Sequence, residues 1–367
     1  MPVSNENIKA DLRSSILEAA DQLDIQNQFR RGYIDHLIRS LLTVDLKDRI
    51  TWKQYFEHPF LEKGDFWKFY TDKKSLGTDL YFEVFSVKKR DGNEKRAIKV
   101  MYLNTLKKKI ENAIKRPCTT RDIKPYINDF IEETKNMDLL RGPNKDNINA
   151  LIFYEYFQTE TEFCIVQELC DGNIQHLLLE KKKFNKKEIY QVLKQLNNTF
   201  HILLDKNLSH KNLRLDKILV KKNDKDDKEV PYIYKLTGLE FNRKIDALFK
   251  RGGAMTNDKY KAPEILINEF SGNNISPNEK NLIYQKADIW SLGVIIFILY
   301  FGKFPFKGNK PIEIYTNISK SEKASLNEIN DPDLKDLLKK MLTEDNKERI
   351  DWNGYFKHKF FSPEKWE

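Results

Sequence analysis

The feature that most constrains this chain is a polar loop that runs directly into an apolar, β-branched segment. It spans residues 208–220, which read Leu-Ser-His-Lys-Asn-Leu-Arg-Leu-Asp-Lys-Ile-Leu-Val. This order of residues is typical of a loop that leads into a buried strand. A chain of 367 residues, 40% of them hydrophobic, is long enough to bury such a strand in two domains or in one large two-lobed domain.

Charge and cysteine usage narrow the classes of partner. The net charge is +9, but basic and acidic residues are interspersed and no nucleic-acid-binding motif accompanies them, so we expect a solvated surface and no nucleic acid. Cys118, Cys164 and Cys170 lack metal-ligand spacing, and their small odd number favours a reducing compartment.

The polar N-terminus predicts no signal peptide, and the apolar run at 289–301 is shorter than the roughly 20 residues that cross a bilayer. We expect a buried helix at that run and a cytoplasmic protein without a membrane partner.

An internal repeat adds a second constraint. Residues 42–58 read Leu-Thr-Val-Asp-Leu-Lys-Asp-Arg-Ile-Thr-Trp-Lys-Gln-Tyr-Phe-Glu-His, and residues 342–358 read Leu-Thr-Glu-Asp-Asn-Lys-Glu-Arg-Ile-Asp-Trp-Asn-Gly-Tyr-Phe-Lys-His. The offset is 300 residues without an insertion. Two copies this far apart cannot stack as neighbouring units, which excludes a solenoid.

Several motifs follow one another in an order that resembles the eukaryotic protein kinases. Residues 208–220 resemble their catalytic loop, His-Arg-Asp-Leu-Lys-Pro-Glu-Asn-Ile-Leu, without a gap. Residues 76–84 resemble the Gly-rich loop, and residues 97–99 resemble the strand that carries Val-Ala-Ile-Lys. Downstream, residues 260–264 contain Ala-Pro-Glu, and residues 288–293 contain the pattern Asp-x-Trp-Ser-x-Gly.

The resemblance implies an α+β, bilobal protein-kinase-like fold, with a small antiparallel β-rich N-lobe and a large helical C-lobe. The domain would cover residues 66–361, with the N-lobe at about 66–168 and the C-lobe at about 170–361. In that family the repeated pattern closes the C-lobe, so residues 1–64 resemble the end of a C-lobe and predict a helical appendage. Two origins stay open for it: a duplicated helical element that docks on the following domain, or the remnant of an upstream kinase domain.

The Gly-rich loop retains one glycine of three. Gly77 is kept, whereas Asp79 and Phe82 bring charge and bulk to positions where the family's backbone approaches the phosphates. In the family the strand lysine, here Lys99, contacts phosphates and pairs with a glutamate, for which Glu133 is the candidate and Glu132 the alternative. If a nucleotide binds, the resemblance implies that it contacts Gly77, Val84, Ala97, Lys99, Glu133, Gln167, Glu168 and Cys170.

The positions that carry the family's chemistry differ here. Asn212 stands in place of the catalytic Asp, and its amide cannot accept a proton as a carboxylate does; a general base contributes roughly 10²–10⁴-fold. Lys217 and Gly238 stand in place of the two metal ligands, and Arg214 replaces the lysine that contacts phosphate. We therefore expect no intact catalytic residue and no metal site.

The positions that brace the fold are retained. The resemblance implies structural roles for His210, Leu239, Glu264, Asp288 and Arg349. Among them, Glu264 of Ala-Pro-Glu and Arg349 of the second repeat copy are expected to form a buried ion pair. Removing one partner of such a pair costs around 3–5 kcal/mol.

The pattern of losses predicts a pseudokinase in intracellular signalling, that is, a catalytically inactive protein-kinase-like module that binds another protein, such as a kinase. The alternative is a weak or atypical ATP-binding Ser/Thr protein kinase, and a third hypothesis is a duplicate without a present role. No cofactor is required under the first hypothesis, and any ATP would bind without Mg.

Overall fold

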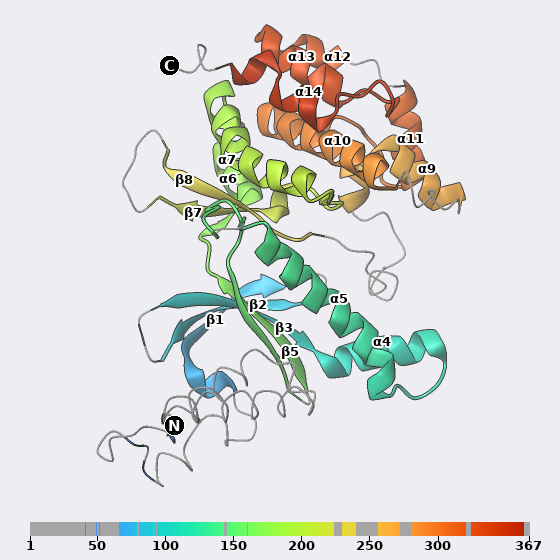
Figure 1. Cartoon of the computed structure of the whole chain (residues 1–367). Helices are drawn as coiled ribbons and strands as arrows, with labels where there is room; N and C mark the ends of the chain where they lie inside the picture. Colours follow the sequence, from blue (N-terminus) through green and yellow to red (C-terminus); the bar gives the residue numbers. More distant parts are fainter. Residues whose placement is uncertain are drawn as a thin grey trace, which may run out of the picture. The chain divides into compact units, whose positions relative to one another are not determined.

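The computed structural model describes residues 66–362 with short gaps, together with Leu41, Arg49 and Thr51 (Figure 1). The gaps are residues 79–80, 91, 93, 143–144, 160, 224–229, 240–255, 272–279 and 321–323. The predicted helical appendage therefore lies outside the described residues, apart from those three positions. The chain divides into two compact units, Met1–Ile123 with Phe153–Leu169, and Lys124–Ile152 with Cys170–Glu367.

In the described part of the first unit, the strands form one antiparallel sheet in the order β1-β2-β3-β5-β4. Aromatic and β-branched side chains, which favour a pleated and half-buried surface, build its core around Phe66, Phe85, Ile98 and Phe157. The bounds are η1 Phe66–Phe69, β1 Tyr70–Thr78, β2 Glu83–Lys89, β3 Lys95–Tyr102, β4 Phe153–Gln158 and β5 Glu162–Glu168.

Two helices follow β3. Helix α4, Leu103–Ile114, buries Leu103, Leu106 and Ile110 at helical spacing, and it ends at Lys115 in a left-handed conformation. Helix α5, Thr120–Leu139, crosses the boundary between the two units in the chain.

Residues 124–152 group with the second unit, although the predicted N-lobe range includes them. The reason is a buried set of hydrogen bonds. Asn147 donates from Nδ2 to Thr199 Oγ1 on α7 at 3.0 Å, and Asn149 donates from Nδ2 to the Tyr234 carbonyl on β8 at 2.8 Å. Because buried polar groups need such partners, this stretch is tied to the helical unit.

The second unit is mainly helical, with a small sheet of β6, β7 and β8 among its described residues. Helix α7 begins with a capping box, in which Asn185 and Glu188 bind each other's backbone N–H groups. The bounds are β6 Gly172–Asn173, α6 Ile174–Lys181, α7 Lys186–Asp205, η2 Leu215–Lys217, β7 Ile218–Lys222, β8 Tyr232–Leu236, η3 Thr256–Tyr260, α9 Pro263–Ser271, α10 Lys280–Phe301, α11 Pro311–Lys320, α12 Ala324–Asn327, α13 Pro332–Met341, α14 Trp352–Phe356 and η4 Lys359–Phe361.

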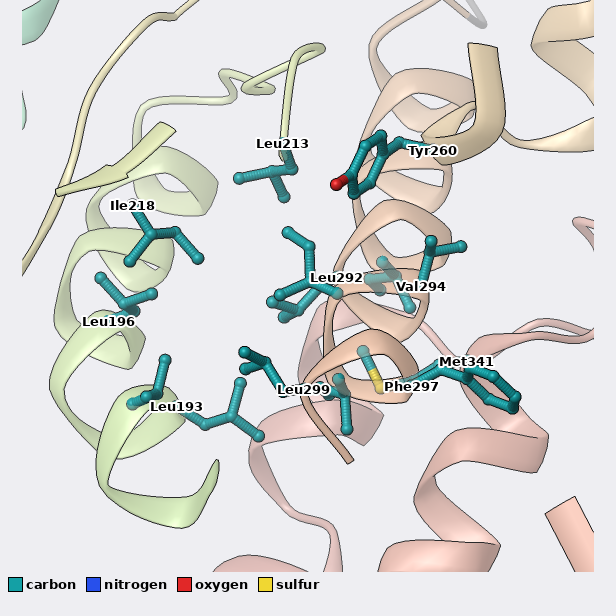
Figure 2. Packing of buried hydrophobic residues seen from close by; sticks show 14 of the residues in the cluster. Leu193, Leu196, Leu213, Ile218, Tyr260, Leu292, Val294, Phe297, Leu299 and Met341 are labelled. Carbon is teal, nitrogen blue, oxygen red and sulfur yellow. The ribbon is translucent and has the colours of Figure 1, made fainter. Parts of the chain in front are cut away.

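Helix α10 is the centre of the second unit's core. Figure 2 shows its side chains, among them Leu292 and Phe297, surrounded by residues from α7, from the 208–220 segment and from α13. With a mean hydropathy of 1.6, its 281–301 stretch is long and apolar enough to cross a membrane. Most of its apolar part, however, is buried inside this core. The predicted buried helix at 289–301 is confirmed, and it is longer than the apolar run because polar residues form its first turns.

These two units confirm the predicted α+β fold, with an antiparallel sheet in the first and packed helices in the second.

Candidate functional site

The 208–220 segment is anchored by one buried carboxylate of α10. Asp288 is 2% exposed, and its two oxygens accept the backbone N–H groups of His210 at 2.5 Å and of Lys211 at 2.8 Å. Lys211 has φ 63°, in the left-handed region that non-glycine residues seldom adopt. The two hydrogen bonds to Asp288 hold this uncommon conformation, which turns the loop towards β7.

His210 links the loop to the segment that follows β8. Its side chain is fully buried, and its Nδ1 accepts the backbone N–H of Asn212 at 3.3 Å. The ring proton therefore lies on Nε2, which donates to the carbonyl of Thr237 at 3.0 Å. This hydrogen bond ties the residue before Gly238 to the start of the loop.

Burial raises the pKa of Asp288 to about 7, although the N–H donors of His210 and Lys211 favour its ionised form. The anchor of the loop therefore changes charge near neutral pH.

The two positions that hold metal ions in the resembled family are in contact here. Gly238 has φ 78°, and a Cβ built on it would lie 2.8 Å from Cδ and 3.3 Å from Cε of Lys217. The backbone N–H of Thr237 also donates to the carbonyl of Lys217 at 3.0 Å. The aliphatic part of Lys217 thus occupies the space into which an aspartate at position 238 would extend. The two substitutions are sterically complementary.

A carboxylate that the sequence analysis did not single out lies beside them. Asp216 Oδ2 is 2.7 Å from Arg214 Nη2 and 3.4 Å from Lys217 Nζ. Burial opposes ionisation of Asp216, but the charges of Lys217 and Arg214 outweigh it and hold the pKa of Asp216 below its ordinary value. In the sequence Asp216 lies between Arg214 and Lys217, and these two neighbouring cations were the signal that could have identified it.

Asp216 is thus engaged by two cations of the protein. Across the described ranges, no group of three or more His, Cys, Asp or Glu side chains is arranged to hold a metal ion. The residues present do not fit the pair of Mg ions that phosphoryl transfer in the resembled family requires.

In the first unit, the sheet register brings several of the implied nucleotide-binding residues opposite one another. Val84 of β2 pairs with Lys99 of β3, and Ala97 pairs with Gln167 of β5. Gly77, with φ 120°, also lies opposite Val84. The register thus places these residues on adjacent strands, their role in nucleotide binding stays a prediction, and Asp79 lies outside the described residues.

Phe82, which replaces a glycine of the loop, is in contact with the strand lysine. The ammonium of Lys99 lies 4.5 Å from the centroid of the Phe82 ring, and Phe82 is 2% exposed. This is cation–π geometry, worth about 0.5–2 kcal/mol depending on solvation. The aromatic ring therefore lies against the lysine that binds phosphate in the resembled family.

The remaining implied residues are placed as follows. Glu133 is half-buried on α5 and Glu132 is exposed, whereas Met137, one turn further on, is buried as expected. The Lys99–Glu133 pair would join two separate units and stays a prediction. Glu168 is buried at the end of β5, and Cys170 is half-buried.

Of the predicted structural residues, four are buried in the second unit and Glu264 is partly exposed; the buried ones are His210, Leu239, Asp288 and Arg349. Leu239 is fully buried, and Arg349 Nη1 and Nη2 donate to the two carboxylate oxygens of Glu264 at 2.7 and 2.9 Å. The expected Glu264–Arg349 pair is therefore present, and its two parallel hydrogen bonds give it strength and direction.

Comparison with known proteins agrees with this geometry. Residues 70–361 match the family model described as "Protein kinase domain". The chain belongs to the protein kinase domain family.

Relatives of this kinase domain include two calcium-dependent protein kinases of malaria parasites and a plant Ser/Thr kinase. Calcium-dependent protein kinase 5 of Plasmodium falciparum is 28% identical over 296 residues, covering 79% of this chain and 44% of that protein. Calcium-dependent protein kinase 4 of Plasmodium berghei is 25% identical over 364 residues, covering 94% and 61%. Serine/threonine-protein kinase ATG1a of Arabidopsis thaliana is 28% identical over 221 residues, covering 59% and 32%. The chain thus spans less than two thirds of the length of these relatives.

A first prediction concerns the pH dependence that Asp288 gives to the kinase domain. Its pKa is about 7 in the folded state against 3.8 ordinarily, so the folded state binds the extra proton between these values. The contribution of Asp288 to the free energy of unfolding should therefore be largest below pH 4 and fall by a few kcal/mol as pH rises through 7.

The measurement is urea unfolding of the natural chain and of Asp288→Asn between pH 5 and 8. The natural chain should lose stability relative to Asp288→Asn across this range, because the amide does not titrate. Asp205→Asn, at an exposed position, is the matched control and should follow the natural chain. A stability difference between Asp288→Asn and the natural chain that is independent of pH would contradict the assignment.

Proposed function

We propose that this kinase domain is a pseudokinase, a catalytically inactive module that acts as a protein-interaction or allosteric scaffold. The observation that carries the proposal is the contact between the Lys217 side chain and Gly238. Phosphoryl transfer in this family depends on positioning and on two Mg ions that neutralise the phosphates. An ammonium group repels divalent cations, and glycine supplies no side-chain ligand.

The residue at the position of the family's catalytic base supports the same proposal. Asn212 carries an amide, which does not take up the proton of a substrate hydroxyl at neutral pH. Loss of a general base lowers the reaction rate roughly 10²–10⁴-fold. Loss of the metal ions removes several kcal/mol of charge stabilisation from the transition state. Both losses affect the same phosphoryl-transfer step, the first at the attacking hydroxyl and the second at the phosphates.

The retained packing supports a role as a folded surface. The Glu264–Arg349 pair and the hydrogen bonds of Asp288 remain complete, and neither one needs a nucleotide. A domain that keeps its internal braces while its metal ligands are replaced fits a scaffold. We propose a protein partner, such as another kinase, in the cytoplasm, with no nucleic acid, no membrane and no required cofactor.

A second candidate function is a weak or atypical ATP-binding Ser/Thr protein kinase that phosphorylates protein hydroxyls. Two residues favour it: Lys99 is kept, and Arg214 provides a cation where the family has its phosphate-contacting lysine. Several relatives carry the name Ser/Thr kinase. Any ATP bound by the pseudokinase would bind without Mg.

A second prediction separates these functions by ligand-induced stabilisation. A ligand that binds the native state raises the melting temperature by mass action, so the melting temperature should be measured with ATP, with and without Mg. We expect no shift that depends on Mg. The double variant Lys217→Asn/Gly238→Asp, which restores both family residues, is the matched control and should gain an Mg-dependent rise.

A clear Mg-dependent rise in the natural chain would refute the pseudokinase assignment. Incorporation of labelled phosphate into a protein substrate, abolished by Lys99→Ala, would favour the second function.

A third prediction tests the contact between Lys217 and Gly238 directly. Gly238→Ala should destabilise the fold by about 1–3 kcal/mol, because the new Cβ meets the Lys217 stem at 2.8 Å and φ is 78°. Lys217→Ala removes that stem, so the double variant should lose about 0.5–2 kcal/mol less than the sum of the single variants.

The free energies of unfolding come from urea titrations of the four chains of this cycle. Gly92→Ala is a suitable control, because a Cβ there would meet nothing within 4 Å. Strict additivity of Gly238→Ala and Lys217→Ala would show that the two side chains do not share this space.

A further inference from the structure

Residues 342–358, the later copy of the internal repeat, pack against the rest of the helical unit, and a buried arginine is central to this contact. Residues 342–360 are here called the closing segment. Arg349 is 1% exposed, donates to both oxygens of Glu264, and uses Nε to donate to the Thr343 carbonyl at 2.9 Å. Its guanidinium carbon also lies 5.0 Å from the centroid of the Trp290 ring. The closing segment therefore needs a receptor with a carboxylate placed as Glu264 is.

The rest of the receptor comes from α7 and α13. The Trp352 ring lies 4.8 Å from that of Phe200, and the Tyr355 hydroxyl donates to Asn197 Oδ1 at 3.0 Å. His358 Nε2 lies 3.0 Å from Asp336 Oδ2, and Phe360 contacts Tyr190 with ring centroids 6.2 Å apart. The closing-segment groove is defined by Tyr190, Asn197, Phe200, Glu264, Trp290 and Asp336.

The first repeat copy has the same residue at every buried position of the closing segment. Apart from Arg49 and Thr51, residues 42–60 lie outside the described part of the chain, so only their sequence enters this comparison. Every position at which the copies differ is exposed or half-buried in the closing segment. The six buried residues and their identical counterparts are Leu342 and Leu42, Arg349 and Arg49, Trp352 and Trp52, Tyr355 and Tyr55, His358 and His58, and Phe360 and Phe60.

Two of the differing positions also suit the local backbone. Asp351 caps α14 by accepting the N–H of Gly354, and the first copy has threonine there, which is also a good N-cap residue. Lys359 is the first residue of η4, and the residue before it has φ −66° and ψ 140°. Proline, which the first copy has at this position, requires that conformation before it and fits the first helical residue.

At position 354 the residue of the first copy does not fit without a local change. A Cβ on Gly354 would lie 2.8 Å from Ile350 Cγ1, so the glutamine of the first copy needs a small shift of that isoleucine.

We propose that residues 42–60 of one copy of this chain bind the closing-segment groove of a second copy, in place of that copy's residues 342–360. Arg49 would supply the guanidinium that Glu264 binds. In a single chain the groove already holds residues 342–360, and their direct attachment to α13 gives them a high effective concentration. The dimer in which residues 42–60 occupy the groove therefore becomes the main species when the attached segment is weakened.

The test weakens the attached segment in the full chain by Arg349→Ala and measures molar mass by light scattering over a hundredfold range of concentration. We expect Arg349→Ala to form a dimer whose fraction and melting temperature rise with concentration. Adding Arg49→Ala should return it to a monomer. Lys47→Ala is the matched control, since it removes one positive charge at a position whose counterpart, Lys347, is exposed, and it should leave the dimer intact.

An Arg349→Ala chain that stays monomeric, or a dimer that persists with Arg49→Ala, would overturn the proposal. If Arg349→Ala does not fold, Trp352→Leu takes its place and Trp52→Leu becomes the second substitution, with the same expected results.

A graft provides an independent measurement of fit. In the full chain, residues 344, 346, 348, 351, 353, 354, 357 and 359 are replaced by the residues of the first copy. The graft should melt within about 3 °C of the natural chain, a shift that corresponds to roughly 1 kcal/mol in a domain of this size. A graft that fails to fold, or that melts as low as Arg349→Ala, would show that residues 42–60 do not suit the groove.

Discussion

The arrangement of the second unit depends on the carboxylate of Asp288. Its hydrogen bonds hold Lys211 in a left-handed conformation and bring the His210 ring against the carbonyl of Thr237. This placement brings Gly238 beside Lys217, because Thr237 precedes Gly238 and its N–H donates to the Lys217 carbonyl. A buried charge of this kind is costly to maintain, and backbone N–H donors are what offset the cost.

The local charges show why the site differs from a metal-dependent kinase. In such an enzyme, carboxylate and amide oxygens surround divalent cations, and their negative charge is balanced by the metal. Here Asp216 is balanced instead by Arg214 and Lys217, both supplied by the same short loop. The balance is local and does not depend on a bound ion. The pseudokinase proposal rests on the contact between Lys217 and Gly238, and this internal neutralisation and Asn212 support it.

The sequence predicted those features that follow from motif spacing. The Glu264–Arg349 pair and the burial of α10 both depend on residue types at fixed separations. Contacts between side chains that the motifs leave unspecified could not be predicted. The Phe82 ring on Lys99 and the lysine stem over Gly238 depend on rotamers and on the left-handed backbone of the glycine. Similarly, the buried hydrogen bonds of Asn147 and Asn149, with the apolar packing of Ala150 and Leu151, show that residues 124–152 belong with the helical unit.

The contact between Lys217 and Gly238 also has a consequence for the evolutionary history of such a chain. An aspartate that returned alone at position 238 would collide with the lysine, and an asparagine that returned alone at position 217 would face a glycine with no acidic partner. Neither step on its own recovers anything that selection could favour. The two positions are therefore coupled, so that a metal site of the family's kind would require substitutions at both of them together.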